Sequence, residues 1–260
     1  MNTLGNLLNF GGKTALITGG ARGAGVAIVR QFAKAGANVA FTYRGGAQEA
    51  QALADELNAG GAKAQAFFFD QSDIASAPVL LDAVEAAFGT VDFLVNNAGI
   101  YPAKPLMDIS EADWDDMFAC NTKGVFFLSR EAASRMKNGG AIVHISSINA
   151  SNPAGQLAHY GMSKAAVEMM TRNMAQVFGP MGVRVNCVAP GLIWKEGQEK
   201  WIPGWRESYC ERAPLGRLVQ AEDVGNACLF LCAPLSSAVT GQVLTVDCGV
   251  TLAPCFDNSL

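Results

Sequence analysis

Residues 14–25 of this 260-residue chain read Thr-Ala-Leu-Ile-Thr-Gly-Gly-Ala-Arg-Gly-Ala-Gly. A short apolar run suited to a buried strand precedes a glycine-rich turn, and the apolar pattern of residues 26–35 has the period of a helix. Glycines at such a turn let the backbone approach a phosphate closely, and the helix N-terminus offers unpaired N–H groups. The stretch therefore predicts a strand–turn–helix unit that binds a nucleotide.

The alternation of strand and helix continues along the chain. Further strands are predicted at 39–43, 64–69, 91–96, 141–146, 183–188 and 242–247, and further helices at 47–57, 77–88, 111–136, 160–178 and 221–232. Strands that are apolar on both faces and separated by helices form parallel sheets covered on both sides. We expect an α/β fold: a single-domain, Rossmann-like, doubly wound parallel sheet with helices on both faces.

No linker or repeat divides residues 1–260, so one domain is expected. Its cofactor half spans about residues 1–145 and its catalytic and substrate half about 146–260. The least regular stretch, 191–214, carries three tryptophans among charges and glycines. It is interpreted as a flexible substrate lid, and a pair of surface helices with aromatic anchors is the alternative.

Composition excludes several classes of function. The net charge is −4 without a long basic run, which argues against nucleic acid as a partner. Half of the residues are hydrophobic, which favours a homo-oligomer. Seven cysteines in irregular positions indicate reduced intracellular thiols, and two histidines give a metal site little to draw on, so no metal is predicted. Neither a signal peptide nor a membrane span is recognisable, so a cytoplasmic protein is expected.

The residues after the second strand concern the choice between NAD and NADP. NAD-binding folds usually carry an acidic residue about 20 positions after the glycine turn, to bind the ribose 2′-hydroxyl. Here this region contains Tyr43 and Arg44, and the first acidic residue of the chain is Glu49. Arg22 and Arg44 are suited to a 2′-phosphate, which a guanidinium binds through two oxygens. The prediction is NADP(H); the alternative is that either arginine is a solvated surface charge.

Five residues carry groups suited to proton transfer, substrate binding or adenine binding. Tyr160 and Lys164 are four apart on one predicted helix face, where an ammonium is expected to lower the phenol pKa for proton transfer. Ser147 precedes Tyr160 by 13 residues and offers a hydroxyl to a substrate oxygen. Asn121, a poor helix former inside a long helical stretch, is expected to hold a water beside Lys164. Asp70 ends the third strand and is suited to accept a hydrogen bond from adenine.

In this order and spacing, the motifs resemble the short-chain dehydrogenase/reductase family over nearly the whole chain. They are Thr18-Gly-x-x-x-Gly-x-Gly25, Asp70, Asn96-Asn97-Ala98-Gly99, Asn121, Ser147, Tyr160-x-x-x-Lys164, Pro190-Gly191 and Asp247. The resemblance implies a catalytic tetrad of Asn121, Ser147, Tyr160 and Lys164, with Tyr160 as the acid/base. It also implies a cofactor site made of Gly19, Ala21, Arg22, Gly23, Ala24, Gly25, Tyr43, Arg44, Asp70, Gln71, Asn97, Ala98, Gly99, Tyr160, Lys164, Pro190, Gly191 and Ile193. Family members commonly form tetramers, so a tetramer or a dimer is expected.

Some residues depart from the family pattern. Ala24 replaces a bulky aliphatic residue, His144 stands where asparagine is frequent, and Cys248 stands where glycine is common. None of these changes removes a group that the chemistry needs. His159, next to Tyr160, is expected at the surface because adjacent helix residues face different ways; the alternative is that it lines the mouth of the active site.

These observations predict an NADP(H)-dependent oxidoreductase that interconverts a ketone and a secondary alcohol, with a small-molecule substrate. Hydroxysteroids, 3-oxoacyl thioesters and polyols or ketoses all remain open. The three tryptophans of 191–214 favour a bulky or apolar substrate, and the balanced charge of this stretch argues against an acyl-carrier protein. The alternative function is a non-catalytic NADP(H)-binding sensor or scaffold on the same fold. An epimerase or dehydratase of the extended branch would need a longer chain.

Overall fold

The computed structural model describes residues 7–193 and 204–252. The strands in them are β1 Thr14–Ile17, β2 Asn38–Tyr43, β3 Lys63–Phe68, β4 Phe93–Asn96, β5 Gly140–Ile145, β6 Val183–Pro190 and β7 Val243–Val246. The α-helices are α2 Ala24–Lys34, α3 Ala47–Ala59, α4 Ser76–Phe88, α5 Glu111–Phe118, α6 Val125–Arg135, α7 Ala158–Phe178, α8 Trp205–Arg212 and α9 Ala221–Cys232. Each strand predicted from the sequence is present, with ends shifted by one or two residues.

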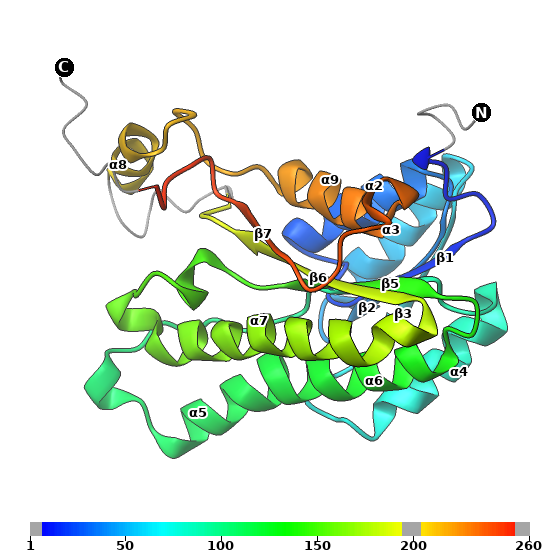
Figure 1. Cartoon of the computed structure of the whole chain (residues 1–260), viewed down its shortest axis with the longest axis horizontal. Helices are drawn as coiled ribbons and strands as arrows, with labels where there is room; N and C mark the ends of the chain where they lie inside the picture. The colour runs from blue at the N-terminus through cyan, green and yellow to red at the C-terminus, as the bar shows by residue number, and fades with distance from the viewer. Residues whose placement is uncertain (1–6, 194–203, 253–260) are drawn as a thin grey trace.

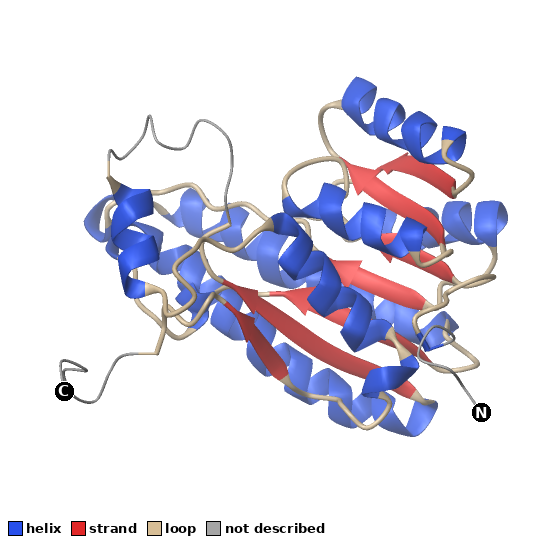
Figure 2. Ribbon diagram, turned by 90° about the horizontal axis from the view of Figure 1, so that it is seen from above, coloured by secondary structure: helices blue, strands red, loops and turns tan. Residues whose placement is uncertain are grey.

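The strands form one parallel sheet in the order β3-β2-β1-β4-β5-β6-β7. In Figure 2 the strand arrows accordingly point to the same edge of the sheet. The order reverses between β1 and β4, because the chain first adds strands on one side of β1 and then on the other. Ligands of doubly wound folds bind at the carboxyl ends of the strands beside this switch point. The predicted Rossmann-like fold is confirmed.

Two helical layers cover the sheet (Figure 1): α2, α3 and α9 lie on one face, and α4, α5, α6 and α7 on the other. The apolar strands alternate between the two cores. In β1, Ala15 and Ile17 pack in the core beneath α2, α3 and α9, whereas Leu16 packs in the core beneath α4, α6 and α7. This is why the strand sequences are apolar throughout instead of alternating with polar residues.

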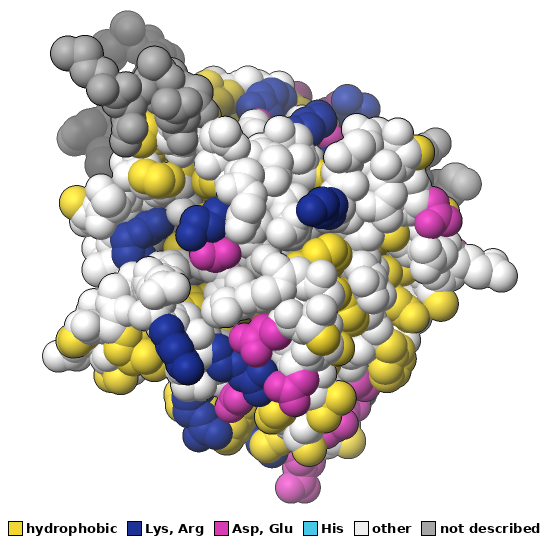
Figure 3. All heavy atoms as spheres, turned by 90° about the vertical axis from the view of Figure 1, so that its right-hand side faces the viewer, with side chains coloured by type: hydrophobic (Ala, Val, Ile, Leu, Met, Phe, Trp, Pro, Cys, Tyr) yellow, Lys and Arg dark blue, Asp and Glu magenta, His cyan; other side chains and the backbone are white. Residues whose placement is uncertain are grey.

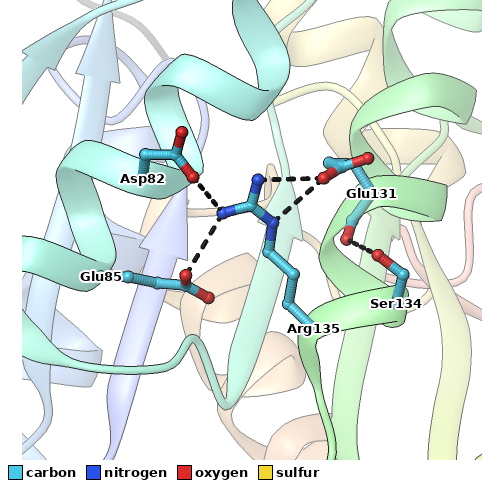
Figure 4. A network of polar contacts seen from close by, with 5 residues as sticks. All are labelled: Asp82, Glu85, Glu131, Ser134 and Arg135. Carbon is cyan, nitrogen blue, oxygen red and sulfur yellow. Dashed lines mark hydrogen bonds and ion pairs between the residues drawn. The ribbon is translucent and has the colours of Figure 1, made fainter.

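Arg135 at the end of α6 joins this helix to α4 (Figure 4). Its guanidinium donates to Asp82 (2.6 Å) and Glu85 (3.2 Å) of α4 and to Glu131 one turn earlier on α6 (3.0 Å). The arginine side chain is 20% exposed and those of Glu85 and Glu131 are each 30% exposed, so these two ion pairs are partly shielded from solvent. They hold α4 and α6 together at the edge of the sheet opposite to the carboxyl ends of the strands.

The long helix predicted at 111–136 differs from the structure in one respect. A π-helical turn, Ala119–Gly124, separates α5 from α6. This turn packs closely on the backbone of Gln71, which only a glycine at position 124 allows, because a Cβ there would lie 1.8 Å from the backbone oxygen of Gln71. The extra residue of the π-helical turn brings Asn121 to the interior, where it is fully buried.

The predicted lid at 191–214 is described only in part. Residues 194–203, with Trp194 and Trp201, lie outside the described residues, as do residues 1–6 and the tail 253–260. The described part contains α8, a helix of the kind that the alternative interpretation expected in this stretch, and it lies beyond the carboxyl ends of β6 and β7 (Figure 1). Its Tyr209 hydroxyl donates to Asp247 O (3.1 Å) and accepts from Leu192 N (3.2 Å), so α8 is tied to the end of the sheet.

Charged side chains are mixed on the face shown in Figure 3, where basic side chains are interspersed with acidic ones and do not gather into one area. None of the helices in the described residues is long and apolar enough to span a bilayer.

Candidate active site

A cleft of about 780 Å³ lies at the carboxyl ends of the strands. Of the eighteen residues predicted to bind the cofactor, every one except Gly25 lines this cleft. The lining residues that were predicted are Gly19, Ala21, Arg22, Gly23, Ala24, Tyr43, Arg44, Asp70, Gln71, Asn97, Ala98, Gly99, Ser147, Tyr160, Lys164, Pro190, Gly191 and Ile193. The structure thus brings the two halves of the predicted site together in one cavity.

The glycine turn between β1 and α2 is held in a conformation that only glycine adopts easily. Gly19 and Gly23 have φ values of +63° and +57°. A Cβ on Gly19 would lie 2.9 Å from Ala98 Cα, and a Cβ on Gly25 would lie 2.2 Å from Gly19 O. Gly25 therefore packs against the backbone of the glycine turn and does not line the cleft. The bare backbone at the start of α2 fits a pyrophosphate, which needs close approach to N–H groups.

Arg44 and Asp70 lie near each other at the end of the cleft formed by β2 and β3. Arg44 Nη1 is 3.9 Å from Asp70 Oδ2, and the arginine side chain is 56% exposed. The Ser72 hydroxyl and backbone N–H donate to Asp70 Oδ1, which lowers the pKa of this carboxyl. Arg44 is thus positioned by a partner and remains accessible, as binding of an anionic ligand requires.

The other end of the cleft is lined by Tyr160, Ser147 and Lys164, which lie close together. Lys164 is 4% exposed, and its ammonium donates to Ile145 O (2.8 Å) and lies 5.7 Å from the centre of the Tyr160 ring. Burial lowers the pKa of Lys164 to about 8. The neighbouring Ser146 hydroxyl donates to Glu168 on α7 (3.0 Å), so Ser147 is the serine that faces Tyr160.

The Tyr160 pKa differs from the expectation. Burial raises it above its ordinary value, and the hydrogen bond with Ser147 acts in the opposite direction without reversing the shift. The ammonium of Lys164 lies over the ring and is held by a backbone carbonyl. Desolvation therefore outweighs the hydrogen bond with Ser147, and the phenol is protonated at neutral pH.

Asn121 does not line the cleft. Its amide accepts from Ile100 N (2.9 Å) and donates to Ile100 O (2.8 Å), so both of its polar atoms hold the loop after β4. A Cβ on Gly99 would lie 3.2 Å from Asn121 Oδ1 and 3.4 Å from Lys164 Nζ, which places the asparagine beside the lysine. The water that was expected here stays a prediction.

Comparison with known proteins agrees with this geometry. Residues 19–251 match the family described as enoyl-(acyl carrier protein) reductase. Gluconate 5-dehydrogenase of Gluconobacter oxydans is 34% identical over 252 residues, which cover 95% of this chain and 98% of that protein. The chain belongs to the short-chain dehydrogenase/reductase family.

Two other relatives of this short-chain dehydrogenase/reductase differ in the substrates for which they are named. The 3-oxoacyl-(acyl-carrier-protein) reductase of Staphylococcus aureus is 35% identical over 241 residues, covering 92% of this chain and 98% of that protein. The crystal structure of a gluconate 5-dehydrogenase from Burkholderia cenocepacia, in complex with NADP and tartrate, has a TM-score of 0.90. It is 32% identical and covers 97% of this chain and 100% of the other.

His144 is the centre of a buried polar network in this short-chain dehydrogenase/reductase. Its Nδ1 is 2.9 Å from Thr171 Oγ1, which donates to Val167 O, and its Nε2 is 3.1 Å from Ser129 Oγ. Ser129 in turn accepts from Asn96 Nδ2 (2.9 Å). Since Thr171 must accept from His144, the ring carries its proton on Nδ1. The network joins β4 and β5 to α6 and α7, the helix of Tyr160.

The buried state of His144 predicts a pH-dependent stability. Burial lowers its pKa from 6.5 to about 3, whereas the unfolded chain titrates near 6.5. Below pH 6.5 the unfolded state therefore binds the extra proton, and stability falls by about 1.4 kcal/mol per pH unit until pH 3. We expect wild type to lose about 2 kcal/mol more than His144→Asn between pH 6.5 and 5 in urea unfolding. Equal losses in the two proteins would contradict a neutral buried His144.

His159 was expected at the surface, and this expectation is wrong. The side chain is fully buried, and neither ring nitrogen has a hydrogen-bond partner among the described residues. Adjacent residues on a helix do face different ways, but His159 is still covered, because both α5 and the turns before α7 pack against α7.

Sequence reasoning missed several lining residues. Tyr101 lies two residues after the motif Asn96-Asn97-Ala98-Gly99, and its ring lies edge-on to that of Tyr160 with centres 6.1 Å apart. Thr18 does not line the cleft, but it holds the loop after β4, since its hydroxyl accepts from Asn97 N (3.1 Å) and Ala98 N (3.0 Å). Thr18 was part of the motif itself, but nothing in the sequence distinguishes a loop-holding hydroxyl from a strand residue.

Proposed function

We propose that this protein is an NADP(H)-dependent oxidoreductase that interconverts a ketone and a secondary alcohol. The observation that carries the proposal is one cleft with Arg22 and Arg44 at one end and Tyr160, Ser147 and Lys164 at the other. A sensor would need the first group only. A buried lysine beside a half-buried phenol is costly to maintain, which favours a catalytic use of the second group.

The residues of the cleft fit NADP(H). The backbone of the turn around Gly19 and Gly23 would hold the pyrophosphate, and Arg22 with Arg44 would bind the 2′-phosphate. Asp70 would accept from adenine, and Lys164 would bind the nicotinamide ribose. When bound, NADP(H) supplies or accepts the hydride. The NADP complex of the Burkholderia cenocepacia relative supports this choice of cofactor.

Tyr160 and its neighbours handle the proton. In reduction, the protonated phenol donates to the carbonyl oxygen while the Ser147 hydroxyl donates a second hydrogen bond to the same oxygen. Lys164, protonated below pH about 8, stabilises the negative charge that the phenol then carries. In oxidation, the phenolate accepts the proton of the alcohol.

We further propose that the substrate is an uncharged ketone or alcohol with apolar groups near the reacting carbon. Tyr101, Pro102 and Ile193 line the described cleft, with Tyr101 beside Tyr160, and the charged lining residues of the described chain are Arg22, Arg44, Asp70 and Lys164. Of those four, only Lys164 lies at the Tyr160 end, and its ammonium is held by Ile145 O. A carboxylate such as that of gluconate would therefore find only this buried cation among the described lining residues.

Self-association is proposed on the exposed face of α7. Met162, Met169 and Val177 are 43%, 53% and 65% exposed, and they recur at intervals of seven and eight residues along one side of the helix. Exposed apolar side chains in one row favour a helix-to-helix interface between two copies. The proposed homo-oligomer, dimer or tetramer, would bury them.

The experiment that tests the function follows the oxidation of NADPH and NADH with a panel of carbonyl compounds. The panel contains steroid ketones, 3-oxoacyl thioesters, neutral ketoses and a keto-acid sugar. We expect turnover with NADPH, and faster turnover of neutral apolar ketones than of the keto acid. Tight NADPH binding without turnover on the whole panel would favour the sensor, and preference for the keto acid would refute the proposed substrate class.

Arg44 is expected to select NADPH over NADH. In Arg44→Gln, the KM for NADPH should rise about 10- to 100-fold, because a charge-assisted hydrogen bond to the 2′-phosphate is lost. The KM for NADH should change by less than about threefold, since NADH lacks this phosphate. Arg30→Gln is the matched control, because Arg30 pairs with Glu56 on the outer surface. An equal rise for both cofactors would mean that Arg44 shapes the cleft without reading the phosphate.

A further inference from the structure

Gln71 joins three segments of the chain at the floor of the cleft. It follows Asp70 after β3, is 3% exposed and lines the cleft. Its side-chain NH₂ donates to Ala98 O (3.1 Å) in the loop after β4 and to Cys120 O (2.9 Å) in the π-helical turn. A single amide group therefore connects the end of β3, the loop after β4 and the turn that carries Asn121.

The orientation of this amide is determined by its partners. Both acceptors are backbone carbonyl oxygens, so only the NH₂ group can face them. The other polar atom, Gln71 Oε1, is buried and accepts no hydrogen bond from the described residues. Leaving an acceptor unsatisfied costs free energy, and an apolar side chain of the same size would avoid that cost. An amide at this position has one advantage over an apolar side chain, which is that it donates these two hydrogen bonds.

The loop at residues 98–100 is held at both of its ends by side-chain amides. Gln71 holds Ala98, and Asn121 holds Ile100 through two hydrogen bonds. Between them lies Gly99 beside Lys164, since a Cβ added to this glycine would lie at an ordinary contact distance, 3.4 Å, from Nζ. The loop therefore borders the lysine ammonium, and a movement of the loop would change the space beside it.

We propose that Gln71 is a positioning residue that fixes loop 98–100 against the π-helical turn and so sets the place of the loop relative to Lys164. The inference rests on the proposed function, since the cleft face of this loop is expected to contact NADP(H). Gln71 acts through Ala98 and Cys120, and its role goes beyond lining the cofactor site. Loss of its NH₂ group loosens the loop, weakens cofactor binding and slows turnover together.

The test compares Gln71→Leu and Gln71→Glu with Gln65→Leu and Gln65→Glu, in which the exposed glutamine of β3 is changed. Amide hydrogen exchange of residues 97–101 is measured on the ligand-free proteins, and NADPH affinity and steady-state kinetics follow. For Gln71→Leu we expect faster exchange at Ile100, roughly fivefold weaker NADPH binding and roughly fivefold lower kcat, since two hydrogen bonds worth about fivefold each are lost. The Gln65 variants should match wild type.

Gln71→Glu supplies a readout that a general packing defect would not give. Its carboxylate would face two carbonyl oxygens, but the protonated acid can donate to one of them. Loop protection and NADPH affinity should therefore recover as the pH is lowered from 8 to 5.5 in Gln71→Glu and not in Gln65→Glu. This arm also decides the proposal if Gln71→Leu fails to fold.

Two outcomes would overturn the inference. One is a folded Gln71→Leu protein with wild-type exchange at 97–101 and wild-type NADPH affinity. The other is a Gln71→Glu protein whose loop protection does not depend on pH. Failure of the wild-type protein to bind NADPH would refute the proposed function instead, and the exchange measurements on ligand-free protein would still decide the role of Gln71.

Discussion

Tyr160→Phe is expected to lower kcat about 10²- to 10⁴-fold, which is the usual contribution of a general acid or base. The affinity for NADPH should stay within about twofold, because the ring remains and only the hydroxyl is removed. Burial keeps the phenol protonated at neutral pH, so this hydroxyl is the proton donor for a carbonyl oxygen. Steady-state kinetics and NADPH fluorescence titration measure the two quantities separately.

The matched control is Tyr101→Phe. Tyr101 lines the same cleft and lies edge-on to Tyr160, but its hydroxyl has no place in the proposed proton transfer. We expect less than about a fivefold change in kcat for this variant. A Tyr160→Phe protein that keeps more than a tenth of wild-type kcat would exclude the phenol as the proton donor.

The direction of the Tyr160 pKa shift adds a pH test to the same experiment. Because the pKa is raised, the phenol form is complete through neutral pH and the phenolate appears only under alkaline conditions. Ketone reduction by wild type should therefore be independent of pH around neutrality, whereas alcohol oxidation should rise with pH. A rate of alcohol oxidation that is flat from pH 6 to 9 would show that bound cofactor lowers the pKa.

The sequence predicted the sheet and the cleft because both depend on local patterns. Apolar strands such as β1 must be covered on both faces, which leaves few arrangements other than a doubly wound sheet. Parallel strands bring all of their carboxyl ends to one edge, so Asp70 and Asn97 had to meet there with the glycine turn.

What the sequence did not predict depends on packing between distant segments. The sequence placed Asn121 beside Lys164 but gave no sign that its amide also binds Ile100, 21 residues earlier in the chain. His159 is buried although it neighbours a residue of the cleft. The pKa of Tyr160 reflects the balance between desolvation and charge, and the depth of burial cannot be read from a four-residue spacing.

Gly25→Ala is expected to destabilise the protein by about 1–3 kcal/mol, the usual cost of overpacking, and to weaken NADPH binding at least about tenfold. The added Cβ would lie 2.2 Å from Gly19 O and 2.8 Å from Asn97 Nδ2. Asn97 donates to Thr18 O and Gly19 O, so relief of the clash must displace the turn or this amide. Either movement disturbs the backbone that would hold the pyrophosphate.

The sign of the stability change separates packing from helix propensity. Gly25 lies in the first turn of α2, where alanine is the better helix former by about 1 kcal/mol, so propensity alone predicts stabilisation. Gly45→Ala is the matched control, since Gly45 lines the cleft but has no atom within 4 Å of its added Cβ. It should change stability by less than about 1 kcal/mol and NADPH affinity by less than about threefold. If Gly25→Ala unfolds at the same urea concentration as wild type and binds NADPH equally well, the close approach of α2 to the glycine turn is not what shapes the phosphate site.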